Sequence, residues 1–206
     1  MLRILIADDH AIVRKGLALL LCEKYPTSQV KEVPGGNEVL EEIIKQIWDT
    51  ILLDISMPGR NGIETLKQIR TNGNKTPVLM LSMHPEEQYA IRVLKAGASG
   101  FVNKASAAEE LLAAVSEILE GRKYITPYIA QKLANSPGDK PDHELLSDRE
   151  MQILQLIASG KTISEIAREL VLSVNTISTY RTRILEKLGL HNSAEMTRYA
   201  LDNNLV

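Results

Sequence analysis

Polar side chains stand at or just after the ends of four short apolar runs in the first half of the chain. They are two adjacent acids, a third acid, a hydroxyl and an ammonium group: Asp8 and Asp9, Asp54, Ser82, and Lys104. Carboxylates held close together raise one another's pKa strongly unless a cation neutralises them. Oxygen ligands favour a hard cation, and Mg²⁺ typically takes one or two carboxylates with water and phosphate oxygens. A hydroxyl, an ammonium group and a divalent cation around one aspartate are what a transferred phosphoryl group needs.

Five strands alternating with five helices are the elements that would bring these residues together. Short apolar runs predict strands at 2–7, 28–33, 50–54, 77–81 and 100–102, and helical patterns predict helices at 11–24, 37–47, 62–71, 86–96 and 107–120. Such βα units predict an α/β fold, a doubly wound five-stranded parallel sheet with helices on both faces. In the flavodoxin-like strand order 2-1-3-4-5, strands 1 and 3 are neighbours and ligands bind beyond the carboxyl ends. We therefore expect the carboxylates, the hydroxyl and the ammonium group to share one edge of the sheet.

Each of these residues also has an ordinary structural interpretation when it is taken alone. An aspartate at a strand end is usually a cap or turn residue, and the Asp8-Asp9 pair is equally consistent with capping the first helix. Lys104 alone would be a surface lysine, and Ser82 alone a turn residue. The coincidence of all five at the ends of four strands favours a site. His10 is interpreted as a helix-start residue rather than as a ligand.

The five residues resemble the receiver domain of two-component response regulators. The resemblance implies that Asp54 accepts a phosphoryl group from a sensor histidine kinase. It implies that Asp8 and Asp9 bind Mg²⁺ with Asp54, assisted by the backbone carbonyl two residues after the acceptor, here that of Ser56. The acid would then be a nucleophile held accessible at the sheet edge.

The same resemblance assigns the phosphoryl oxygens to Ser82 and Lys104, and the role of switch aromatic to Phe101. On phosphorylation, Ser82 would move toward the phosphoryl group, and the Phe101 ring would turn into the space that Ser82 vacates. Two positions depart from the common receiver pattern. Ala105 follows the lysine where many receivers have proline, and Met83 follows the hydroxyl where many have a small side chain. A thioether at that border predicts slower attack of water on the phosphorylated aspartate.

The second half of the chain shows helical patterns only. We expect a receiver at 1–121, a linker at 122–144 with a short helix starting near Thr126-Pro127, and an all-α domain at 145–206. Ser-x-x-Glu and related capping boxes predict helix starts at 106–109, 147–150, 162–165 and, in an Asn variant, 192–195.

Residues 163–188 fit a helix-turn-helix, two short helices joined by a tight turn. Ile177, Ile184 and Leu188 share one face of the second helix, and polar residues lie opposite. A small helical packing module is the plain alternative, because 145–206 carries seven basic and seven acidic residues and so has no net charge. Arg181, Arg183 and Lys187 nevertheless make the second helix locally basic.

Residues 146–196 also resemble the LuxR/NarL-type DNA-binding domain, through the Leu-x-x-Arg-Glu start at 146–150 and Lys187-Leu188. The resemblance implies a recognition helix at about 174–188 in the major groove of promoter DNA. The residues implied to face the bases are Asn175, Ser178, Thr179 and Thr182, and those implied to contact phosphates are Arg183 and Lys187. It also implies a homodimer on phosphorylation and RNA polymerase as a further partner.

Bulk properties agree with a cytoplasmic protein without a membrane partner. The net charge is −2, no apolar stretch approaches about 20 residues, and the start of the chain turns acidic too early for a signal peptide. The single cysteine, Cys22, excludes an internal disulfide framework and is expected to fill the core.

The leading interpretation is a phosphorylation-dependent transcription regulator, whose only enzymatic activity is self-phosphorylation and self-dephosphorylation at Asp54. Two alternatives remain open at this point. One is a Mg²⁺-dependent phosphotransferase or phosphatase that uses Asp54 on external substrates; an enzyme of that type usually needs an acid where this chain has Ser56. The other is an adaptor whose helical domain docks on a protein.

Overall fold

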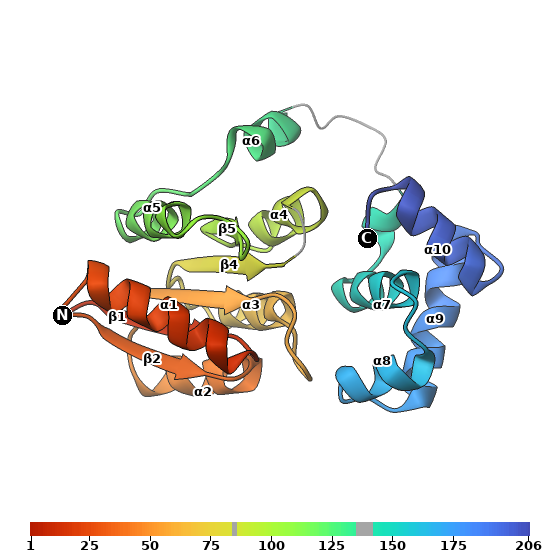
Figure 1. The fold of residues 1–206 in the computed structure, drawn as a ribbon, viewed down its shortest axis with the longest axis horizontal. Coiled ribbons are helices and arrows are strands. Elements are labelled where there is room, and N and C mark those ends of the chain that lie inside the picture. The colour runs from red at the N-terminus through yellow and green to blue at the C-terminus, as the bar shows by residue number, and fades with distance from the viewer. Residues whose placement is uncertain (84–85, 135–141) are drawn as a thin grey trace. The chain divides into compact units, whose positions relative to one another are not determined.

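The computed structural model describes residues 1–83, 86–134 and 142–206. The chain divides into two compact units, Met1–Ser136 and Pro137–Val206. We call them the receiver unit and the helical unit and describe each by itself (Figure 1). Among the described residues, no helix is both long enough and apolar enough to cross a membrane.

The receiver unit is built on a five-stranded parallel sheet in the order β2-β1-β3-β4-β5, which confirms the predicted topology. Strands β1, β3 and β4 are buried along almost their whole length, as expected for strands covered on both faces. The strands are β1 (Arg3–Ala7), β2 (Gln29–Val33), β3 (Thr50–Asp54), β4 (Val78–Ser82) and β5 (Gly100–Asn103).

Six helices accompany the sheet in this unit. They are α1 (Ala11–Lys24), α2 (Gly36–Lys45), α3 (Gly62–Thr71), α4 (Glu86–Lys95), α5 (Ala108–Leu119) and α6 (Pro127–Ala134). The last begins at the predicted Thr126-Pro127 step, where the backbone N–H of Ile129 donates to the Thr126 hydroxyl at 3.3 Å. Helix α6 lies within the first compact unit, whereas the sequence pattern assigned 122–144 to a linker.

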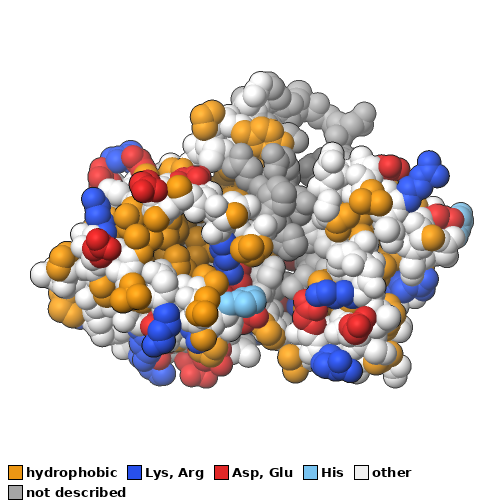
Figure 2. Space-filling view, in the orientation of Figure 1, with side chains coloured by type: hydrophobic (Ala, Val, Ile, Leu, Met, Phe, Trp, Pro, Cys, Tyr) orange, Lys and Arg blue, Asp and Glu red, His pale blue; other side chains and the backbone are white. Residues whose placement is uncertain are grey.

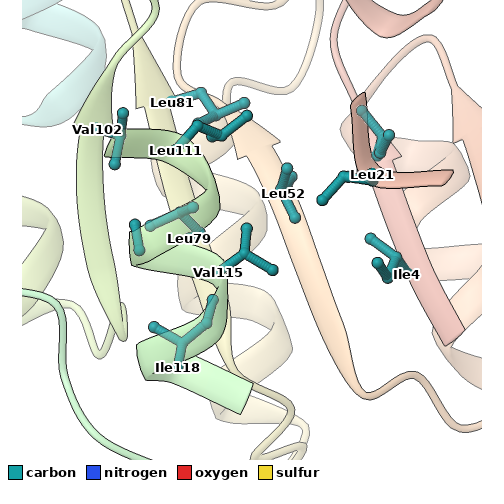
Figure 3. Packing of buried hydrophobic residues seen from close by; sticks show 11 residues of the cluster. Ile4, Leu21, Leu52, Leu79, Leu81, Val102, Leu111, Val115 and Ile118 are labelled. Carbon is teal, nitrogen blue, oxygen red and sulfur yellow. The ribbon is translucent and has the colours of Figure 1, made fainter. Parts of the chain in front are cut away.

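The hydrophobic core under α1 and α5 follows the alternation of the strands (Figure 3). Ile4, Leu52 and Leu79 point from three strands toward Leu21 of α1 and Val115 of α5. The residues that alternate with them are buried as well, so both faces of the sheet are covered. This packing fixes the register of the strands, and the register sets where their polar ends lie.

Two sequence expectations about this unit are wrong. Cys22 is exposed and does not fill the core, because the buried line of α1 runs through Leu21 and the next residue lies about 100° further around the helix. Ser106 does not cap α5, whose N-cap is Ala107 without a side-chain hydrogen bond. The Asn103 side chain instead accepts from the backbone N–H of Ala105 at 2.8 Å, and this Asx turn delays the helix by one residue.

The helical unit contains a 3₁₀ helix, η1 (Asp142–Leu145), and four α-helices: α7 (Asp148–Ala158), α8 (Ile163–Glu169), α9 (Val174–Leu188) and α10 (Ser193–Asp202). The capping boxes predicted at Ser147 and Thr162 are both complete. At Asn192 only half of the box forms, because the Glu195 carboxylate accepts from the backbone of His191 instead.

Candidate functional site

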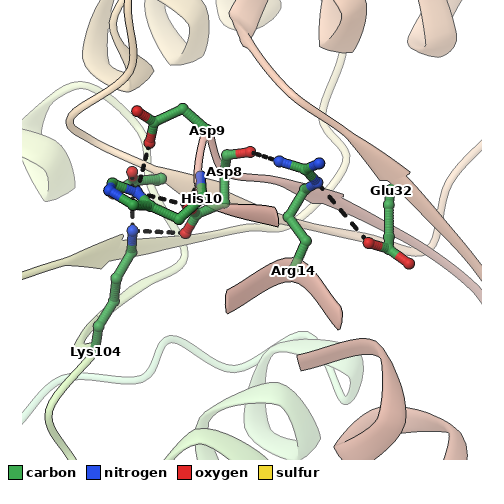
Figure 4. Close-up of polar contacts among 7 residues, drawn as sticks. Asp8, Asp9, His10, Arg14, Glu32 and Lys104 are labelled. Carbon is green, nitrogen blue, oxygen red and sulfur yellow. Dashed lines mark hydrogen bonds and ion pairs between the residues drawn. The ribbon is translucent and has the colours of Figure 1, made fainter. Parts of the chain in front are cut away.

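The predicted acids and the lysine meet at the carboxyl edge of the sheet (Figure 4). Asp54 ends β3, and Asp8 follows β1, its neighbour in the sheet. The Lys104 ammonium lies 2.6 Å from Oδ2 of Asp8 and 2.9 Å from Oδ2 of Asp54, and all three side chains are almost wholly buried. Asp9 is partly exposed at the rim. The convergence expected from strand order is therefore present.

Burial raises the pKa of Asp54 to about 6. The positive charge of Lys104 opposes this rise, while the negative charge of Asp8 adds to it. The ionised carboxylate is thus a costly species in this position, and it is also the species that can attack phosphorus. Any cation that enters the site stabilises the reactive form.

The donor set fits a divalent cation. Asp8, Asp9, His10 and Asp54 each offer one ligand atom, and these atoms all lie within 4.8 Å of one another. Oδ1 of Asp54 is buried and accepts no hydrogen bond from the side chain of any described residue. Carboxylate oxygens of this kind are the ligands that Mg²⁺ prefers. Ser56 lies in the partly buried turn that follows β3, two residues beyond Asp54.

The hydroxyl and the aromatic side chain assigned to the switch are both buried. Ser82 ends β4, and its backbone carbonyl accepts from the backbone N–H of Lys104 at 2.7 Å. This bond ties the end of β4 to the loop that carries the lysine. Phe101 is only 1% exposed. The turn of this ring on phosphorylation stays a prediction. Met83, in contrast, is 67% exposed.

Two contacts behind the site were not found from the sequence. Gly62 opens α3, and a Cβ on it would lie 2.0 Å from the backbone oxygen of Asp54. Asn61 caps this helix through a complete capping box with Glu64, which the Asn-x-x-Glu spacing in the sequence could have indicated. Arg14 donates to the backbone oxygen of Asp8 at 2.6 Å, a contact across six residues that no local pattern announces (Figure 4).

In the helical unit, α8 and α9 form the expected helix-turn-helix. Ile177, Ile184 and Leu188 are buried, as predicted for the packing face of α9. The residues implied to face bases are all exposed: Asn175, Ser178, Thr179 and Thr182. The hydroxyls of Thr179 and Thr182 donate to the backbone oxygens four residues earlier, at 2.9 and 3.2 Å. In this conformation they offer acceptor lone pairs and methyl groups rather than donors.

The basic residues of α9 have three different surroundings. Arg183 is exposed, as a phosphate contact requires. Arg181 is partly buried, and its Nε donates to the Ser193 hydroxyl on α10 at 2.9 Å, which places it at the core edge. Lys187 lies 2.6 Å from the carboxylate of Glu150, a buried member of the α7 capping box. The ammonium of Lys187 is therefore partly committed to holding α9 against the start of α7.

Two family patterns match the chain, one in each half. The pattern of the response regulator receiver domain matches residues 4–116, and that of the bacterial regulatory proteins of the luxR family matches residues 144–200. The first span contains every acid, hydroxyl and lysine of the site described above. The second contains the whole helix-turn-helix.

Two relatives match along the whole of this chain and nearly all of their own length. The chain is 32% identical over 209 residues to response regulator UvrY of Escherichia coli K12, covering all of this chain and 96% of that one. It is 34% identical over 215 residues to the oxygen regulatory protein NreC of Staphylococcus aureus JH9, covering all of this chain and 99% of that one.

A solved structure is similar over nearly the whole chain. It is RcsB from Salmonella enterica serovar Typhimurium bound to promoter rprA in the presence of the phosphomimetic BeF3⁻, with 28% identity, a TM-score of 0.66, and coverage of 97% of this chain and 98% of that one. Together with the acid cluster and the helix-turn-helix, these matches show that the chain belongs to the two-component response regulators of the LuxR/NarL type, as a phosphorylation-dependent, DNA-binding regulator of transcription.

Proposed function

We propose that Asp54 is the phosphoacceptor and that a sensor histidine kinase is the donor. A carboxylate oxygen of Asp54 forms the new bond to phosphorus while the bond to the donor's imidazole nitrogen breaks. Lys104 and the Ser82 hydroxyl bind the transferred oxygens. The observation that carries the assignment is the buried Asp54 carboxylate, only 1% exposed, with the Lys104 ammonium 2.9 Å away.

Mg²⁺ is the cofactor that this donor set supports. Asp8, Asp9 and Asp54 would hold it with the backbone carbonyl of Ser56, and the ion supplies neutralisation of the charge on the phosphoryl oxygens. The residues themselves then orient the acceptor and exclude water. The same site carries the protein's own phosphorylation by small donors and its own dephosphorylation, and we propose no reaction on other substrates.

Phosphorylation adds about two negative charges and three strong acceptors at Asp54. The Ser82 hydroxyl gains a hydrogen bond by moving toward them, and its backbone bond to Lys104 carries that motion into the start of the following loop. Phe101 lies two residues before the end of β5, so the β5 surface is the first to respond. We propose that this change favours a homodimer.

The face of α1 is the better candidate for the dimer contact. Ile12 and Leu19 lie seven residues apart on α1 and are 87% and 73% exposed. Figure 2 shows hydrophobic side chains gathered on the receiver surface between α1 and α5. Among the described residues of α4, β5 and α5, no large hydrophobic side chain is exposed to that degree. Burying such residues favours association.

We propose the receiver at 1–121, the linker at 122–144 and the DNA-binding domain at 145–206. We also propose that the protein acts in the cytoplasm, with promoter DNA and RNA polymerase as partners. The exposed polar face of α9 would enter the major groove. A single module of this size buries only about 600–1,000 Å² of protein on DNA. Tight binding therefore needs two copies on paired half-sites.

Replacing Asp54 with alanine tests the assignment. The variant should take up no phosphoryl group from a small phosphodonor, because no other described carboxylate lies beside both Lys104 and the end of β4. Its binding to the operator should weaken without being abolished, since the helix-turn-helix is intact. Phosphate-affinity gels measure the first effect and gel shifts the second. Phosphate-dependent binding at full strength by Asp54→Ala would refute the acceptor assignment.

The operator for that experiment comes from selecting random DNA with the full chain, before and after treatment with the phosphodonor. A site with two-fold symmetry, enriched more strongly after treatment, supports the phosphorylated dimer. Gel shifts at several salt concentrations separate DNA binding from adaptor function, because phosphate contacts make affinity fall with salt.

Met83 should slow the loss of the phosphoryl group. Its exposed side chain directly follows Ser82, where it borders the path of attacking water. Met83→Ala should therefore hydrolyse its aspartyl phosphate faster, by several-fold. The measurement is the decay of phosphorylated protein on phosphate-affinity gels, with Ile44→Ala, at an exposed position of α2, as the control. An unchanged decay rate in Met83→Ala would show that the thioether does not shield the phosphoryl group.

Arg183 and Lys187 should differ in their effect on DNA binding. Arg183→Ala should lower the salt slope of binding by about one, as expected for one lost phosphate contact. Lys187→Ala should mainly destabilise the helical unit, because it leaves the buried Glu150 carboxylate without its partner at 2.6 Å. Arg198→Ala on exposed α10 is the control. A lower slope for Lys187→Ala with unchanged stability would restore Lys187 as a phosphate contact.

A further inference from the structure

We propose that His10 is a ligand of the metal in the acid cluster, and that the site therefore takes a divalent transition ion with imidazole affinity, such as Ni²⁺ or Co²⁺, more tightly than Mg²⁺. The inference rests on the metal site proposed above and adds a nitrogen donor to it. It departs from the sequence interpretation, in which His10 only starts α1.

The positions of the donor atoms suit one shared ion. Nδ1 of His10 lies 2.8 Å from Oδ1 of Asp9 and 3.3 Å from Oδ1 of Asp8 (Figure 4). Neighbouring ligands about 2.1 Å from an octahedral ion are about 3.0 Å apart. A hydrogen bond explains one such distance, but here a single nitrogen faces oxygens of two residues. The ligand atom of Asp54 lies within 4.8 Å of the same group.

The Lys104 ammonium pairs with Oδ2 of Asp8 and Oδ2 of Asp54, whereas Nδ1 of His10 faces the other oxygen of Asp8, Oδ1. Oδ1 of Asp54 remains buried and without a side-chain donor among the described residues. Asp54, more than nine-tenths buried, thus offers an oxygen within 4.8 Å of three further donor atoms, an arrangement that suits a cation.

Among the described residues, the His10 ring makes no polar contact other than those with Asp8 and Asp9. His10 occupies the N-cap position of α1, but no side-chain hydrogen bond caps the helix. Its backbone N–H also donates to Oδ1 of Asp8, at 2.8 Å. The ring is 67% exposed, so an ion can reach it from solvent. Substituting His10 therefore removes a nitrogen donor while leaving the start of α1 as it is.

Imidazole discriminates between ions that carboxylates alone do not separate well. Three carboxylates suit Mg²⁺ and Mn²⁺, whereas an added imidazole nitrogen favours later first-row ions. Mg²⁺ keeps water in place of weak nitrogen donors. The ratio of Ni²⁺ to Mg²⁺ affinity thus reports on His10, whereas the Mg²⁺ affinity alone reports on the carboxylates.

The test is titration calorimetry of the full chain with MgCl₂ and with NiCl₂. Wild type should bind both, with Ni²⁺ the tighter. His10→Ala should lose roughly 10-fold or more in Ni²⁺ affinity and less than about threefold in Mg²⁺ affinity. His191→Ala, which removes an exposed histidine of the helical unit, is the matched control and should change neither. With Co²⁺ bound, the visible absorption band should shift in His10→Ala and not in the control.

The possible failures are distinct. If wild type binds no Mg²⁺, or binds it equally after Asp9→Asn and Asp54→Asn, the proposed metal site itself is wrong. If Mg²⁺ binds at the carboxylates but His10→Ala leaves the Ni²⁺ to Mg²⁺ ratio and the Co²⁺ band unchanged, only the role of His10 is overturned. An equal loss of Ni²⁺ affinity in His191→Ala would mean that nickel binds to surface histidines, and it would overturn the role of His10 as well.

Discussion

Asp54→Asn should stabilise the receiver unit by roughly 3 kcal/mol at pH 8 and by nothing below pH 4. Burial raises the pKa of Asp54 from 3.8 to about 6, so the native state holds this proton more tightly than the unfolded chain. Between pH 3.8 and about 6 the stability of the receiver unit falls as pH rises. The unfolded chain releases this proton there, whereas the native state must either keep it or bury an ionised carboxylate. Asparagine has the same shape as aspartate and no charge. In the variant the Lys104 ammonium still has the Asp8 carboxylate as its partner, 2.6 Å away in the wild type.

The protein carries its own probe for this measurement. Trp48 is the only tryptophan in the chain and is 2% exposed within the receiver unit, so its fluorescence follows unfolding of that unit in urea. Glu23→Gln, which neutralises an exposed acid on α1, is the control and should give no pH-dependent gain. If Asp54→Asn and wild type are equally stable at pH 8, the buried carboxylate is ionised at no cost and the raised pKa is wrong.

Gly62→Ala should destabilise the receiver unit by about 3 kcal/mol or more. The added Cβ would lie 2.0 Å from the backbone oxygen of Asp54 and 3.0 Å from Cα of Ile55, both in the chain that holds the acceptor. Backbone cannot rotate away as a side chain can. Helix α3 must therefore move off the end of β3, and the rate of phosphorylation should fall with stability.

Gly16→Ala is the matched control for this variant. Gly16 lies inside α1, and a Cβ there would meet no heavy atom within 4 Å. Alanine should therefore stabilise the helix by about 0.5–1 kcal/mol, since glycine loses more freedom on folding. Urea unfolding followed by Trp48 compares the two. A Gly62→Ala protein as stable as wild type would mean that α3 adjusts freely and does not position Asp54.

The sheet and the receiver acids could be predicted because local patterns determine them. Runs of apolar residues identified each strand to within about two residues, and a polar residue at the end of a parallel strand has only one edge of the sheet to occupy. The sequence therefore predicts that Asp8, Asp54 and Lys104 lie together, as the structure shows. The order of the strands followed from the connection rules of such folds.

What the sequence did not disclose depends on contacts between distant segments. Cys22 looked like a core residue because its neighbours are apolar, but the direction of α1 turns it outward. Lys187 looked free on a polar face, yet Glu150, 37 residues away, lies against it. His10 looked like a helix start and is one, but only the fold brings its ring to the acids. These surroundings follow from tertiary packing and cannot be deduced from the local sequence pattern.

The burial of Phe101 has a consequence for the dose response of the regulator. If the buried ring is the arrangement of the active form, the unmodified protein has a small free-energy gap to that form. Moving an equilibrium from 1:99 to 99:1 takes about 5.5 kcal/mol, and a smaller initial gap needs less. The unphosphorylated protein should then occupy its promoters to a measurable extent, with kinase activity adjusting a basal level of transcription rather than starting it from zero.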